Sequence, residues 1–182
     1  MTAAVITASA SITVAVLVFI LNQRAQLRVE RRRLRLERVG NQLRDLYGPL
    51  HALNDVNERV WQALHEAQLP NKELRRADSG LPPDRRAEWK RWIEHALLPA
   101  NRKMRDLILG HADLVVEVSM PEPLRVFCAH VAAYEVLISI EDPDDDPTSR
   151  ALIEHPGEPY VQYVRRSFAD LKQEQARLLG KR

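Results

Sequence analysis

Three residues of types that transfer protons lie close together in the sequence. His130 and Tyr134 are one helical turn apart, and Glu135 follows directly. Imidazole, phenol and carboxylate groups can all donate or accept a proton in general acid–base catalysis. A histidine satisfied by hydrogen bonds inside a helical core explains the same pattern more simply. An enzyme with a site near His130 is therefore kept only as a second alternative function.

The other reactive residue types lack the spacing of known sites. The six histidines form neither H-x-x-x-H nor H-E-x-x-H, and the single cysteine, Cys128, leaves no pair for zinc. The acidic stretch 141–146 lacks the alternating oxygen ligands and central glycine of a calcium loop. Neither a glycine-rich phosphate loop nor a G-x-S-x-G elbow is present. We expect no catalytic residue, no metal and no cofactor, and Cys128 to be a buried thiol in a reducing compartment.

The elements that would position these residues are predicted to be helices. Apolar residues recur every three or four positions, and no run alternates with a period of two, so the chain is predicted to be all-α. The predicted helices are 22–47, 49–68, 85–109, 122–140 and 158–179. The last four fit an antiparallel four-helix bundle. Residues 69–84 and 141–149 read as loops, and 111–120 fits either a short helical turn or an extended loop.

Prolines and glycines mark where these helices bend or stop. Pro49 and Pro99 lack a backbone donor and clash with the preceding turn. We expect a kink or a new helix at Pro49, and a kink near 95–98. Gly110 and Gly180 follow the last apolar residues of their helices and are predicted to end them.

The run Ala3–Leu21 is apolar and uncharged. Its length matches the roughly 20 residues that a helix needs to cross a bilayer core. Arginines follow it at once, and positive charge beside a span stays cytoplasmic. A cleaved signal peptide is the main alternative, but no Lys or Arg precedes the run and residues 22–24 do not resemble a cleavage site. We expect an uncleaved single-pass anchor in the inner membrane of a bacterial cell, with the N-terminus outside and the C-terminal domain in the cytoplasm.

The positive charge is concentrated beside the predicted anchor. Residues 22–46 hold eight arginines against three acidic residues, a charge of +5, so the rest of the chain carries −3 to reach the net +2. The acidic remainder argues against nucleic acid as a partner. The bilayer and its anionic head groups are the predicted partners, although a topology signal on a solvated helix face explains the run more simply. The predicted contacts are Arg24, Arg28, Arg31, Arg32, Arg33 and Arg35.

A heptad pattern from Ala4 to Leu53 suggests self-association. Its clearest part, the heptad seam, consists of Leu36, Val39, Leu43 and Leu46. Arginines beside the seam would repel each other in a parallel pair, and the same leucines could pack on the chain's own helices instead. A homo-oligomer acting through the span and a juxtamembrane coiled coil is the first alternative function.

The sequence divides into a transmembrane anchor at 1–21, a basic juxtamembrane helix at 22–47 and a cytoplasmic helical bundle at 48–182. Because the sequence contains no catalytic or ligand-binding motif, we predict that the protein is a non-catalytic adapter, scaffold or regulatory protein with a protein partner. Aromatic residues are enriched at interface hot spots, although core packing explains Trp89 and Trp92 as well. The predicted partner surface consists of Trp61, Trp89, Trp92, Tyr160 and Tyr163.

Overall fold

The computed structural model describes residues 2–67, 82–139 and 152–180, with side chains from Leu17 onward except those of 83, 86 and 139. These residues form helices, turns and irregular segments with no strand among them, which confirms the all-α prediction. The predicted loops 69–84 and 141–149 lie almost wholly outside this part. The chain divides into two compact units, residues 1–40 with 174–182, and residues 41–173.

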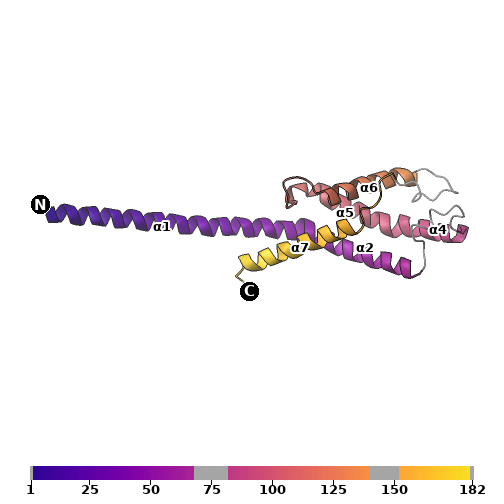
Figure 1. Ribbon diagram of the computed structural model, residues 1–182, viewed down its shortest axis with the longest axis horizontal. Coiled ribbons are helices and arrows are strands. Elements are labelled where there is room, and N and C mark those ends of the chain that lie inside the picture. The colour runs from indigo at the N-terminus through magenta and orange to yellow at the C-terminus, as the bar shows by residue number, and fades with distance from the viewer. Residues whose placement is uncertain (1, 68–81, 140–151, 181–182) are drawn as a thin grey trace. The chain divides into compact units, whose positions relative to one another are not determined.

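The first unit is built on α1 (Thr2–Asn41), which is one unbroken helix (Figure 1). Most of the predicted anchor lies outside the described side chains, which begin at Leu17. Among the described residues, no helix is long and apolar enough to cross a membrane. The last turns of α7, from Glu174 onward, belong to the same unit as α1.

The second unit contains the predicted helical bundle. Its elements are η1 (Gln42–Tyr47), α2 (Gly48–Glu66), α4 (Pro83–Trp92), η2 (Ile93–Leu97), α5 (Leu98–Gly110), η3 (Ala112–Leu114), α6 (Glu122–Ser139) and the first part of α7 (Glu158–Leu178). The helix α5 packs against both α2 and α6 and runs antiparallel to them (Figure 1). The fully buried side chains include Leu46, Tyr47, Leu50, Met104, Ile108, Leu124, Phe127, Val131, Tyr160 and Val164.

Each of the two helix-interrupting prolines follows a π-helical turn. The Gly48 amide, just before Pro49, donates to the carbonyl of Leu43, and the Leu98 amide, just before Pro99, donates to that of Ile93. Both bonds span five residues instead of four. A proline ring clashes with the carbonyl four residues earlier, and the wider π turn moves that carbonyl away. A kink or a new helix is predicted at Pro49 and a kink near 95–98, and the structure has a π-helical turn before each proline, with α2 following η1 directly at Gly48.

The predicted ends of the later helices agree with the structure. The helix α5 ends at Gly110, and α6 begins at Glu122 as expected. Gly180 follows α7 with a φ of +73°, the left-handed conformation in which glycine commonly ends a helix. The ambiguous stretch 111–120 contains the short helical turn, the 3-10 turn η3, which is followed by irregular backbone with bends at 116–119.

Candidate functional site

The arginines after the predicted anchor are all exposed on α1. Arg24, Arg28, Arg31 and Arg35 follow one another at intervals of four, three and four residues, which places them on one face of the helix. Arg32 borders this arginine face, whereas Arg33 lies on the opposite side of α1. Four of the six predicted contacts therefore share one surface.

Two of these six arginines are bound by the end of α7. The Arg35 guanidinium donates to both carboxylate oxygens of Glu174, over 2.6 and 3.0 Å. Arg32 donates through Nε and Nη2 to the carbonyl oxygen of Leu178, over 2.8 and 2.5 Å. The hydrogen bond from Arg35 holds the pKa of Glu174 below its usual value and raises the pKa of Arg35 itself. Within the described part of the chain, Arg24, Arg28, Arg31 and Arg33 form no such bond.

The heptad seam is largely buried within a single chain. Val39 and Leu46 are fully buried, Leu43 is 9% exposed and Leu36 is half-buried. This burial favours the simpler interpretation, in which these side chains pack against the chain's own helices. Self-association through the seam stays a prediction.

The candidate histidine lies in a cluster of aromatic rings between α6 and the segment before α7. The Nδ1 of His130 is 2.8 Å from the carbonyl oxygen of Ile153, so Nδ1 carries the proton and donates it. The ring of His155 meets that of His130 edge-on at 5.2 Å and also packs on Phe127 and Tyr160. The Nδ1 of His155 accepts the amide hydrogen of Gly157 over 2.9 Å. Both histidines are thus held as neutral structural groups.

Burial explains the weak basicity of both histidines. It lowers the pKa of His130, partly offset by the bond to Ile153. His155 is exposed by surface area, but the rings of Phe127, His130 and Tyr160 pack around its imidazole. The loss of water on these sides, together with the neighbouring His130, lowers the pKa of His155 to about 4.

We therefore expect the bundle to lose stability in mild acid. A histidine kept neutral in the fold stabilises the protein above its unfolded pKa of 6.5, and this stabilisation is lost as the pH falls toward about 4. After a discount for solvent around His155, the loss should be on the order of 1 kcal/mol. Denaturant unfolding at a series of pH values measures it. In His155→Phe, the free energy of unfolding should fall less between pH 6.5 and about 4. His95→Gln changes an exposed histidine of η2 and should leave the fall in this free energy unchanged. An unaltered decline in His155→Phe would contradict this assignment.

Glu135, the third residue of the proton-transfer candidate, is engaged elsewhere. It accepts from Arg102 over 2.7 Å and from Arg105 over 2.6 Å, linking α6 to α5. These arginines hold the pKa of Glu135 below its usual value against the opposing effect of burial. Burial raises the pKa of the half-buried Cys128 thiol to about 11, so it is protonated and a poor nucleophile. Of the three proton-transfer candidates, His130 and Tyr134 therefore lie together, with ring centres 5.7 Å apart, whereas Glu135 is paired with α5.

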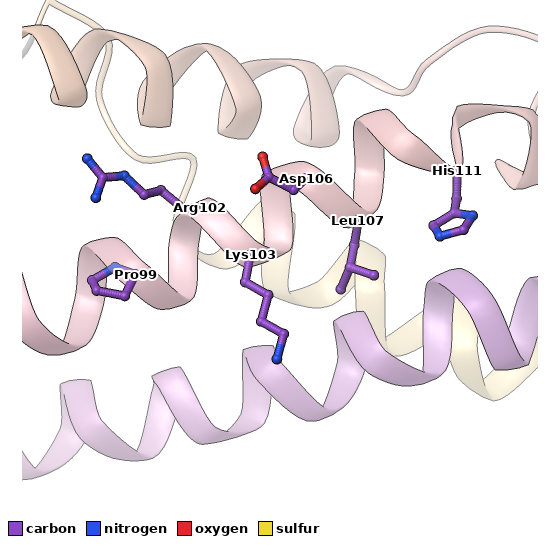
Figure 2. Close-up of a pocket in the computed structure, with 6 residues that line it drawn as sticks. All are labelled: Pro99, Arg102, Lys103, Asp106, Leu107 and His111. Atoms are coloured by element: carbon purple, nitrogen blue, oxygen red, sulfur yellow. The ribbon is translucent and has the colours of Figure 1, made fainter.

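A shallow hollow of about 510 Å³ lies along α5 (Figure 2). Its lining residues are Pro99, Arg102, Lys103, Asp106, Leu107 and His111. Figure 2 shows Lys103, Leu107 and His111 on one side of the helix, and Arg102 and Asp106 on the other. Arg102 is already paired with Glu135. The lining side chains therefore point away from both sides of α5 and do not converge on one point.

The predicted partner surface divides into exposed and buried residues. Trp61 and Trp92 are 43% and 40% exposed. Trp89 is buried, and its ring meets that of Trp61 edge-on, with ring centres 5.9 Å apart. Tyr160 is also buried, and its ring stacks parallel to that of Phe127, with ring centres 4.1 Å apart. Trp89 and Tyr160 are core residues, so including them in a partner surface was wrong. Tyr163 is half-buried and takes part in a hydrogen-bonded chain.

That chain of hydroxyl groups was not predicted. The amide of Val116 donates to the Tyr47 hydroxyl over 3.3 Å, and the two tyrosine hydroxyls are 2.9 Å apart. Tyr163 donates to the Glu117 carboxylate over 2.8 Å, so its oxygen must accept the proton of Tyr47. Burial raises the pKa of both tyrosines, which keeps both hydroxyls protonated. This hydroxyl chain ties the loop after η3 to η1 and α7.

A second bond holds the same loop. The side-chain amide of Gln42, which is almost fully buried, donates to the carbonyl of Leu114 over 2.9 Å. The only sequence signal was a polar residue, Gln42, within an otherwise apolar stripe. It gives no indication of which loop supplies the acceptor.

Among the described residues, no group of three or more histidine, cysteine or acidic side chains could hold a metal ion. The ion pairs of Glu174 and Glu135, the ring cluster around His130 and the hydroxyl chain each join one helix or loop to another. Compared with models of known protein families, with curated proteins and with solved structures, the chain matches none.

Proposed function

We propose that the protein is a single-pass, membrane-anchored adapter or scaffold without catalytic activity. The anchor is the run Ala3–Leu21, the N-terminus lies outside, and the helical bundle lies in the cytoplasm. The observation that carries the proposal is the uninterrupted helix α1: its first half contains the uncharged run, and its second half exposes the arginines. A helix of this kind suits a bilayer core followed by an anionic surface.

The polar residues considered for chemistry are engaged within the fold. Glu135, His130 and Tyr163 each make hydrogen bonds that join secondary structure elements. The exposed rings of Trp61 and Trp92 remain available to a protein partner, and tryptophan is a frequent hot-spot residue.

Two alternatives have less support. Self-association through the heptad seam would need Leu43 and Leu46, which are already buried in one chain. An enzyme with a site near His130 would have to work without Glu135, which is paired with two arginines.

Capture of a tagged copy from gently solubilised native membranes tests the proposal. We expect the chain in the membrane fraction, resistant to alkaline extraction, together with a partner in fixed stoichiometry that mass spectrometry identifies. Replacing Trp61 and Trp92 with alanine should reduce the partner's recovery at least about tenfold, because interface tryptophans often contribute 2 kcal/mol or more.

Other outcomes would point to different functions. Recovery in the soluble fraction would contradict the anchor. Recovery of the chain alone, as a multimer, would favour self-association. A reporter that is active only after export, fused to the C-terminus, should stay inactive; activity would reverse the proposed orientation.

A further inference from the structure

The end of α7 presents two negative groups to α1. The Glu174 carboxylate is held by Arg35, and the Leu178 carbonyl, at the negative end of the α7 dipole, is held by Arg32. Both contacts lie inside one compact unit of the chain. They use the forked geometry by which guanidinium groups also bind phosphate.

These contacts are exposed and therefore easily exchanged. The Arg35 and Glu174 side chains retain 50% and 25% of their exposure. Ion pairs at this level of exposure are weak and are screened by salt. A nearby surface dense in phosphate groups can compete with them.

We propose that the end of α7 (Glu174–Gly180) is a latch that competes with lipid phosphate for Arg32 and Arg35. With the latch closed, these two arginines are bound within the chain while Arg24, Arg28 and Arg31 stay free. On an anionic bilayer, phosphates replace the Glu174 carboxylate and the Leu178 carbonyl, and the last turn of α7 is released. The membrane's charge thereby controls whether the end of α7 is available to a partner. This inference rests on the proposed membrane anchor.

Charge favours lipid as the competing partner. Arg24 lies three residues after the uncharged run, where head groups would lie next to a membrane span, and Arg32 and Arg35 continue the same stretch of positive charge 11 and 14 residues after Leu21. The rest of the chain carries −3, which would repel an extended polyanion such as a nucleic acid.

Hydrogen exchange of the full chain tests the latch in two kinds of vesicle. One contains phosphatidylcholine alone, and the other has about a third of that lipid replaced by phosphatidylglycerol. The amides of Leu179 and Gly180 donate within the last turn, to Gln175 and Arg177, and report its order. We expect exchange from 174 to 180 at least about tenfold faster in the anionic vesicles, with α6 unchanged. Equal exchange in both would overturn the latch.

Variants separate the latch from a general effect of charge. Glu174→Gln should give fast exchange already in the neutral vesicles, with little further change in the anionic ones. Arg33→Gln removes an arginine from the opposite side of α1 and should behave as the wild type. If Arg33→Gln loosens the last turn as much as Glu174→Gln does, the specific latch is contradicted.

Failure of the anchor gives a different result. A chain that does not float with either vesicle contradicts the proposed function. A chain that floats with both vesicles but shows no difference in exchange contradicts only the latch. Release in neutral vesicles by added duplex DNA, with none in anionic vesicles, would assign the arginines to nucleic acid instead.

Discussion

Replacing Gly48 with alanine should destabilise the protein by about 2–3 kcal/mol, the reverse of the usual effect of this change in a helix. Gly48 has right-handed helical angles, with φ of −66° and ψ of −57°, so its backbone does not require glycine. Alanine in such a position normally stabilises a helix by up to about 1 kcal/mol. The opposite is expected here because a Cβ on Gly48 would overlap the backbone carbonyl oxygen of Leu43.

The overlap cannot be relieved by turning a side chain. The Leu43 carbonyl accepts the amide hydrogen of Gly48 and thereby closes the π turn that precedes Pro49. Moving this carbonyl would break that bond and displace Leu46 and Tyr47, both fully buried. Denaturant unfolding followed by circular dichroism measures the loss, because the chain is almost wholly helical where it is described.

Two other glycines provide matched controls. A Cβ on Gly40, in α1, or on Gly110, at the end of α5, would meet no atom within 4 Å. Alanine at Gly40 should stabilise the protein by up to about 1 kcal/mol, and at Gly110 it should change stability by less than about 0.5 kcal/mol. If Gly48→Ala proved as stable as the wild type, the π turn would have relaxed into a regular α-helix, and the explanation from Pro49 would fail.

Helix positions could be predicted because their signals are local. The helix predicted at 122–140 is observed at Glu122–Ser139, and that predicted at 158–179 at Glu158–Leu178. Periodic apolar residues fix the helical type, and proline and glycine mark the ends. The positions of irregular backbone also followed from Pro49 and Pro99. Their π form did not, because packing of the surrounding side chains decides which carbonyl an amide can reach.

The contacts that each side chain makes could not be predicted, because the partners are distant in the sequence. Tyr160 is predicted to be a surface residue, but in the structure its ring stacks on that of Phe127, which is distant in the sequence. Arg32 and Arg35 bind residues 146 and 139 positions away. Glu135 sits one residue from Tyr134 in the sequence but pairs with arginines of α5. One helix face can pack against several neighbours, and the sequence pattern alone does not choose among them.

Replacing Tyr47 with phenylalanine should destabilise the protein by about 2 kcal/mol although the ring still fits. Tyr47 is fully buried, and its hydroxyl both accepts from the Val116 amide and donates to Tyr163. Removing the Tyr47 hydroxyl leaves the part-buried Val116 amide without its acceptor. It also removes the hydroxyl that donates to Tyr163. Unfolding experiments measure the total loss, and hydrogen exchange should show the loop 115–121 loosening before the rest of the bundle.

Tyr160→Phe is the matched control, because its hydroxyl is equally buried but donates only to the sulfur of Met104, over 3.5 Å. Sulfur is a weak acceptor, so this variant should lose less than about 0.5 kcal/mol. A Tyr47→Phe, Tyr163→Phe double variant should be more stable than the sum of the single effects predicts, by about 1 kcal/mol, since both changes remove the same bond. Equal losses for Tyr47→Phe and Tyr160→Phe would mean that the rings alone hold the loop, whereas a larger loss for Tyr47→Phe assigns that role to the hydroxyl chain.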